Sequence, residues 1–126
     1  MSEGPVERLW AAIQARDWVA AREQLVESVT IDWPATGERF SGRERYLEVQ
    51  RIYPEGWSIE VQTVVREGRR VAVEARVPHG DEVFFCAAFY ELEDGVITWG
   101  VEHWSDGRAS PAPGWRTHLA EPLPGR

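Results

Sequence analysis

The second half of this chain is a succession of period-two segments, and no other feature of the sequence limits the fold as strongly. Apolar and polar residues alternate through four segments in turn: 57–67, 70–77, 83–92 and 96–104. Alternation with this period places one set of side chains on each face of a β-strand. The Asp94-Gly95 pair before the last segment is typical of a tight hairpin turn. The second half therefore predicts strands that pair in order as an antiparallel meander.

The first half predicts helices, because its apolar residues recur at helical spacing. Helices are expected over three segments: 5–16, 18–26 and 43–53. Asp17 can cap the second helix, and Ser41 with Glu44 has the spacing of a capping box before the third. Between them, residues 28–33 alternate as one short strand, and residues 35–39 are expected to form a loop.

Helices followed by a meander predict an α+β fold. The two or three N-terminal helices would pack on one face of a strongly bent, mostly antiparallel sheet. We expect a single domain over residues 1–106, followed by a Pro/Gly-rich C-terminal tail over 107–126 that has no periodic pattern.

The composition argues against several classes of function. The net charge of −7 disfavours nucleic acid and anionic membranes as partners, because both select basic surfaces. No apolar run approaches the ~18 residues of a membrane span, and the acidic N-terminus does not resemble a signal peptide, so a cytoplasmic location is expected. Cys86 is the lone cysteine, no spacing matches a metal site, and no glycine-rich loop suits a phosphate. We therefore expect no metal and no cofactor.

The order of these elements, together with four short stretches, carries a resemblance to a known fold. The stretches are Arg8-Leu9-Trp10-Ala11-Ala12-Ile13 with Asp17-Trp18, Ile31-Asp32-Trp33-Pro34, Phe40-Ser41-Gly42-Arg43 and Leu92-Glu93-Asp94-Gly95-Val96-Ile97. Over residues 5–106 the chain resembles the nuclear transport factor 2-like superfamily, in particular its SnoaL-like polyketide cyclases. Scytalone dehydratase, the ketosteroid isomerases and limonene epoxide hydrolase share this cone-shaped fold. The resemblance implies a cavity for a small apolar molecule, and a homodimer formed through the outer face of the sheet.

Comparison with these relatives removes some of their chemistries. Where the ketosteroid isomerases carry their general base, this chain has Trp33, and where they carry an oxyanion-binding tyrosine it has Leu9. Neither side chain can do that work. A pair of cavity histidines, as in scytalone dehydratase, is not expected, since the histidines fall in a turn (His79), on the last strand (His103) and in the tail (His118).

One acid does match a relative's active-site position. Limonene epoxide hydrolase has an acid seven residues after the hairpin glycine, and that count leads here to Glu102. That enzyme also uses an arginine and an aspartate two residues apart on an inner strand. The nearest pair in this chain is Glu74 and Arg76, in which the acid comes first and is a glutamate.

Glu102 and His103 are neighbours on a strand, so they point to opposite faces unless a bulge intervenes. The resemblance places Glu102 inside, whereas the apolar alternation of Ile97, Trp99 and Val101 would place His103 inside. The sequence therefore offers Glu102 and His103 as alternative proton-transfer groups. Six residues are expected to form the cavity walls: Trp33, Phe40, Tyr46, Gln50, Trp57 and Trp104.

Two functions remain open at this point. The first is a cavity that binds a small hydrophobic or polyketide-like molecule and performs acid/base chemistry of the cyclase, isomerase or hydratase type. The second is a non-catalytic ligand-binding or dimerisation module with the same fold.

Overall fold

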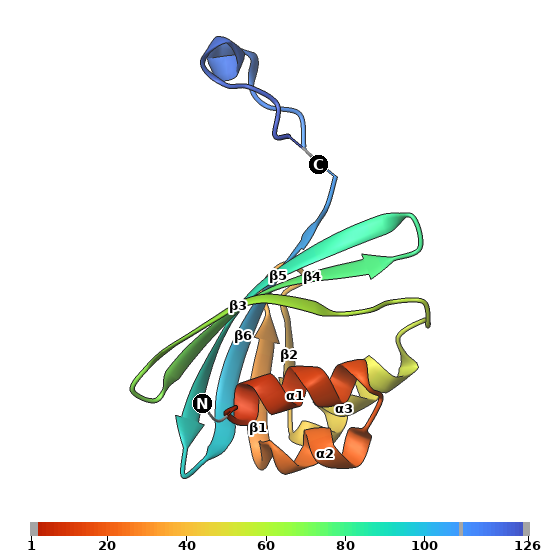
Figure 1. Cartoon of the computed structure of the whole chain (residues 1–126), viewed down its shortest axis with the longest axis vertical. Helices are drawn as coiled ribbons and strands as arrows, with labels where there is room; N and C mark the ends of the chain where they lie inside the picture. The colour runs from red at the N-terminus through yellow and green to blue at the C-terminus, as the bar shows by residue number, and fades with distance from the viewer. Residues whose placement is uncertain (1–2, 109, 125–126) are drawn as a thin grey trace.

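The computed structural model describes residues 3–108 and 110–124. Six strands form one curved sheet in the order β2-β1-β6-β5-β4-β3 (Figure 1). The elements are α1 (Pro5–Gln14), α2 (Trp18–Glu23), β1 (Leu25–Trp33), β2 (Glu38–Ser41), α3 (Arg43–Ile52), β3 (Glu60–Glu67), β4 (Arg70–His79), β5 (Glu82–Glu93), β6 (Val96–Asp106) and the 3-10 helix η1 (Gly114–Leu119). The expected α+β cone is confirmed, with its sheet mostly antiparallel.

The helices cover one face of the sheet, and the core lies between the two layers (Figure 1). The apolar stripe of α1, which includes Leu9 and Trp10, is buried against the sheet. Asp17 caps α2 as expected, since its carboxylate accepts a hydrogen bond from the Ala20 backbone N–H at 3.1 Å. On α3 the buried residues are Tyr46 and Leu47. The helix periodicity in the sequence therefore marks the faces that the fold buries.

The meander β3-β4-β5-β6 pairs in order, as the alternation predicts. Strand β1 joins it by pairing with β6, and this contact is the parallel one in the sheet. Asp32 of β1 lies opposite Val101 of β6. The end of β1 therefore lies beside the end of β6, which brings Trp33 next to Glu102 although 69 residues separate them in the chain.

Three local expectations are wrong. The loop expected over 35–39 ends early, because residues 38–41 form strand β2 by pairing with the end of β1. Ser41 belongs to that strand, so α3 is capped by Gly42, whose φ of 95° suits glycine, and no side chain caps it. Finally, α2 ends at Glu23, because Leu25 already pairs with Ile97 of β6.

An irregularity in β6 decides which way its side chains point. Glu91 of β5 pairs with Trp99, but Leu92 pairs with Ile97, so Thr98 is an extra residue in the ladder. A bulge of this kind shifts the alternation by one residue. Ile97 and Gly100 are both buried as a result.

The tail extends away from the cone (Figure 1) and contains the short helix η1. Trp115 on this helix is 73% exposed. Within the residues that the structure describes, no helix is long and apolar enough to cross a membrane.

Candidate functional site

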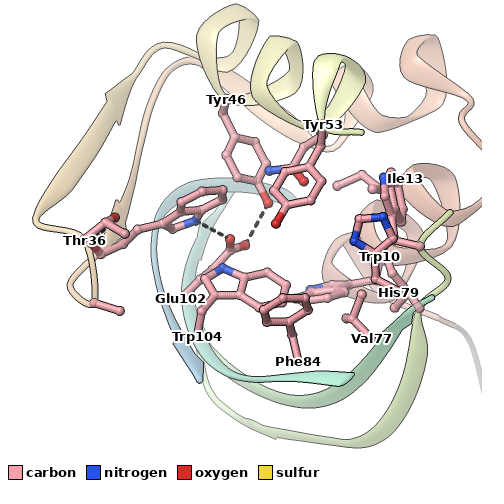
Figure 2. Close-up of a pocket in the computed structure, with 15 residues that line it drawn as sticks. Trp10, Ile13, Thr36, Tyr46, Tyr53, Val77, His79, Phe84, Glu102 and Trp104 are labelled. Carbon is pink, nitrogen blue, oxygen red and sulfur yellow. Dashed lines mark hydrogen bonds between the residues drawn. The ribbon is translucent and has the colours of Figure 1, made fainter. Parts of the chain in front are cut away.

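A cavity of about 250 Å³ lies between α1, α3 and the inner face of the sheet (Figure 2). Its walls are mainly apolar and aromatic, with large contributions from Trp10, Trp33, Trp57, Phe84 and Trp104. This volume is close to the lower end of the ~300–1,000 Å³ typical of small-molecule sites. The cavity is therefore suited to a compact, largely apolar molecule.

Glu102 of β6 lies at the cavity wall and is almost fully buried, with 1% of its surface exposed. The Trp33 indole N–H donates to its Oε1 at 2.8 Å. The hydroxyls of Tyr46 and Tyr90 both donate to its Oε2, at 2.7 and 2.5 Å. Figure 2 shows the Tyr46 hydroxyl directed at the carboxyl group. The donors come from β1, α3 and β5, so the fold holds the carboxyl from three sides.

A further residue supports this cluster from behind. The Trp10 indole N–H donates to the Tyr90 hydroxyl at 3.1 Å, so Tyr90 accepts from Trp10 while it donates to Glu102. Gly100 lies opposite Tyr90 in the ladder, and a Cβ there would stand 2.6 Å from the tyrosine ring. The absence of a side chain at Gly100 therefore makes room for the ring that carries the hydroxyl.

The surroundings of Glu102 raise the pKa of its carboxyl above the ordinary 4.5. Burial is the main cause, because it disfavours the charged form. The hydrogen bonds from Tyr90, Tyr46 and Trp33 oppose this shift by stabilising the carboxylate. The Trp104 N–H also lowers the pKa of the carboxyl, although its geometry does not reach that of a hydrogen bond.

The neighbouring titratable groups remain protonated. Burial and the charge on Glu102 raise the pKa values of Tyr46 and Tyr90, so both hydroxyls stay hydrogen-bond donors. Burial also raises the pKa of the Cys86 thiol, which makes it a poor nucleophile. None of the ion pairs found among the described residues includes Glu102. Its charge is thus balanced by neutral donors alone.

This arrangement leaves Glu102 one position for a ligand. An ionised carboxylate offers about four lone-pair directions. Two on Oε2 are taken by the tyrosines, and one on Oε1 is taken by Trp33. The remaining lone pair on Oε1 is the place where Glu102 could accept a proton or a hydrogen bond.

The structure brings most of the expected wall residues together. Trp33, Tyr46, Gln50, Trp57 and Trp104 all line the cavity. Phe40 does not, because it packs edge-on against Trp33, with ring centroids 4.7 Å apart, and supports that ring from outside.

The structure also separates the two candidate acid/base residues. Glu102 is in the cavity, whereas His103 is exposed on the opposite face of the sheet, where its ring lies 6.2 Å from that of Phe89. Glu74 and Arg76 have other partners than Glu102. Arg76 donates to Glu60, and Glu74 accepts from the Thr63 hydroxyl.

Sequence reasoning missed other residues of the site. His79 is the last residue of β4 rather than part of a turn, and with Tyr53 it lines the cavity (Figure 2). Tyr90 falls within the predicted strand 83–92 and Trp10 within the predicted helix 5–16, but the sequence gives neither residue a role in the site. The one available signal was Gly100, since a strand glycine often marks the close approach of another group.

Comparisons with known proteins agree with this fold. The SnoaL-like domain family matches residues 6–99. A crystal structure of a candidate ketosteroid isomerase from Kribbella flavida is similar, with 30% identity, a TM-score of 0.86, and coverage of 95% of this chain and 87% of that one. No curated protein matches the sequence significantly.

Two solved structures with named chemistry share the fold at lower identity. IdmH, a candidate polyketide cyclase from Streptomyces antibioticus, is 19% identical, with a TM-score of 0.68 over 79% of this chain and 88% of that one. An epoxide hydrolase from M. tuberculosis, described as similar to limonene epoxide hydrolase, is 20% identical, with a TM-score of 0.68 over 80% of each chain.

Proposed function

This chain belongs to the SnoaL-like domain family, and we propose that it binds a small apolar molecule in its cavity and that Glu102 transfers a proton on that molecule. The observation that carries the proposal is the buried carboxyl of Glu102, which lies in an aromatic cavity with one lone pair of Oε1 unused. The proton step is common to cyclisation, isomerisation and hydration, the reaction types that the resemblance suggests.

The surroundings of Glu102 favour transfer in both directions. Its raised pKa makes the carboxylate a better base than an exposed glutamate. The three donors then stabilise the carboxylate when the proton is returned. A group that gains and then loses a proton needs both effects. Burial alone would favour the protonated acid, and the hydrogen-bond donors alone would favour the carboxylate.

A non-catalytic binding site is the second candidate, and one observation favours it. Three donors already satisfy most of the carboxyl's hydrogen-bonding capacity, which is also how a purely structural buried glutamate is held. In addition, Trp33 and Leu9 stand where the ketosteroid isomerases carry their catalytic groups. In this case the cavity would bind a molecule without changing it.

Exchange of carbon-bound protons separates the two candidates. 1-Tetralone, a bicyclic ketone of suitable size, is first titrated while tryptophan fluorescence reports binding. Its α-protons are then followed by NMR in D₂O. We expect the protein to accelerate exchange and Glu102→Gln to reduce this by roughly 100-fold or more, as for loss of a general base. His103→Ala is the matched control and should retain the activity. A ketone that binds without faster exchange would favour the non-catalytic site.

The outer face of the sheet supports the expected homodimer. Val65, Ala72, Phe89 and Val101 lie directly across from one another on neighbouring strands. Phe89 is 44% exposed and Val65 is 58% exposed. We propose that a second copy covers this row, and that the cone over residues 1–106 forms the functional unit with the tail over 107–126 as an appendage. The cytoplasmic location expected from the sequence remains part of this proposal.

A further inference from the structure

The cavity tryptophans fall into two groups. The indole N–H groups of Trp10 and Trp33 have acceptors, the Tyr90 hydroxyl and Glu102 Oε1. The indole N–H groups of Trp57 and Trp104 make no hydrogen bond with any residue that the structure describes, although both nitrogen atoms are buried. The amide nitrogen of Gln50 is also buried without a partner. All three residues line the same cavity.

This concentration of unpaired donors is unusual. A buried polar group without a partner costs about 1–3 kcal/mol, and most such groups in proteins are paired. Among the described residues four buried side-chain atoms have no hydrogen-bond partner, and three of them belong to cavity residues. The fourth is Nε of Arg43, a residue that does not line the cavity. The unpaired donors therefore coincide with the proposed binding site.

The donors come from separate elements. Trp104 follows Glu102 by two residues on β6, so its ring lies on the same face of the strand (Figure 2). Gln50 follows Tyr46 by one helical turn on α3, so the two share a face of that helix. A molecule in the cavity would thus meet one donor beside Glu102 and others along different walls.

The third donor is held firmly in place. The Arg16 guanidinium stacks on the Trp57 ring, 3.3 Å from its centroid. Arg16 also donates to the Trp57 backbone carbonyl at 2.8 Å, and pairs with Glu55 at 2.7 Å. These contacts fix the indole from outside the cavity, so that its N–H has a defined direction before a ligand binds.

From these donors we infer the class of ligand, an inference that rests on the proposed binding function. We propose that the cavity selects an uncharged, mostly apolar molecule with at least two acceptor oxygens, of the ketone, ether or ester type. These oxygens accept from the N–H groups of Gln50, Trp57 and Trp104. An ammonium group does not meet this requirement, because it has only donors and cannot accept from the unpaired N–H groups of Gln50, Trp57 and Trp104.

A series of bicyclic molecules of similar shape tests this class. Tetralin has no acceptor, 1-tetralone has one, 4-chromanone has two, and 1-aminotetralin carries an ammonium group. We expect binding to strengthen by roughly fivefold to tenfold for each acceptor, as for one net hydrogen bond. 1-Aminotetralin should bind no better than tetralin.

The indole N–H signals in a ¹H–¹⁵N spectrum show where the oxygens bind. In the full-length protein, 4-chromanone should move the Trp57 and Trp104 signals downfield, as expected for newly formed hydrogen bonds. The signals of Trp10 and Trp33 should show no such shift, since those N–H groups already have acceptors. Trp115 in the tail, whose side chain is exposed, serves as the reference.

Variants complete the test. Trp57→Phe, Trp104→Phe and Gln50→Met should each weaken 4-chromanone binding by roughly fivefold to tenfold while changing tetralin binding less. Trp99→Phe, outside the cavity wall, is the matched control. Equal affinities for tetralin and 4-chromanone, with no downfield shift, would overturn the inferred ligand class but leave an apolar cavity. If no member of the series binds, the proposed binding function fails as well.

Discussion

Glu102 and His103 are adjacent in the chain, but their surroundings have almost nothing in common. Glu102 is buried on the inner face of β6, where three donors hold its carboxyl. His103 is exposed on the outer face, with the ring of Phe89 as its aromatic neighbour. Successive side chains on a strand point to opposite faces, so the candidate acid/base group and the surface histidine are neighbours in the chain but lie on opposite sides of the sheet. The face of the sheet that a side chain reaches therefore decides whether it meets the cavity or the outer surface.

The same contrast occurs on the neighbouring strand. Tyr90 of β5 is fully buried and connects Trp10 to Glu102. The preceding residue, Phe89, lies on the outer face, where it is partly exposed. The inner face thus carries aromatic residues with hydrogen-bonding groups, and the outer face carries an apolar row suited to a protein contact. The next three predictions test this division, from the largest expected effect to the smallest.

Removing a hydroxyl from the inner face should change the free energy of unfolding far more than adding one to the outer face. Tyr90→Phe removes a donor from Glu102 and leaves the Trp10 N–H unpaired. It should lower the free energy of unfolding by about 1–3 kcal/mol. Phe89→Tyr adds the same hydroxyl on the outer face and should change it by less than about 0.5 kcal/mol. Urea denaturation of both variants measures the difference, and similar values would mean that the inner cluster contributes little to stability.

The raised pKa of Glu102 should make the protein less stable as the pH rises. Between about pH 4.5 and the higher pKa in the folded state, the folded protein retains a proton that the unfolded chain has released. The free energy of unfolding then falls with pH, by at most about 1.4 kcal/mol per pH unit for one proton. Above the folded pKa this loss is complete and no longer changes.

Comparing wild type with Glu102→Gln isolates this effect. The salt-bridged carboxylates Asp32, Glu44 and Glu55 have lowered pKa values, so their contribution to the free energy of unfolding is lost as the pH falls. Both proteins contain these groups, so this loss cancels in the comparison. Subtracting the two pH profiles should leave a component that declines above about pH 4.5. His103→Gln should retain it. A flat difference would indicate that the donors cancel the desolvation of Glu102.

The smallest effect on the cone itself is expected on the outer face. Phe89→Glu places a charge in the apolar row but touches no group of the cavity. Wild type should have the molar mass of a dimer in light scattering, and the variant that of a monomer, because a charge in the middle of an apolar interface is costly. The far-UV spectrum should remain that of the wild type. A monomeric wild type would refute the proposed dimer.

The sequence predicted the fold well, because the elements that form the layers have strong local patterns. The α1 stripe, the Asp17 cap and the four meander strands all follow from spacing and turn residues. Strand β2 was missed, since its four residues have no independent pattern and become a strand only by pairing with β1. The expected cap at Ser41 was wrong for the same reason: pairing with Thr30 makes that residue part of the strand.

Bulges explain why the period-two pattern assigned some residues of β6 and β3 to the wrong face of the sheet. On β6 the extra residue Thr98 reverses the phase, so Ile97 faces inward together with Gly100 and Glu102. The alternation that favoured His103 had grouped Ile97 with Trp99 and Val101 on one inner face, but the bulge separates Ile97 from those two residues, which lie on the outer face. On β3, Gln62 is an extra residue between Val61 and Thr63, which turns Val64 toward the core and leaves Val65 exposed. A period-two pattern identifies a strand reliably but identifies its inner face only up to the first bulge.

The sequence by itself determined that this chain forms helices over a meander, that Glu102 on the last strand matches an acid of a relative, and that tryptophans are available to surround it. Only the tertiary structure decided that Glu102 rather than His103 enters the cavity, and which groups hold it. Its donors lie 12, 56 and 69 residues away in the chain. The physical reason is that the direction of a strand residue depends on its ladder partners, and the partners of a buried carboxyl depend on packing between distant elements. Neither is encoded in the local pattern around residue 102.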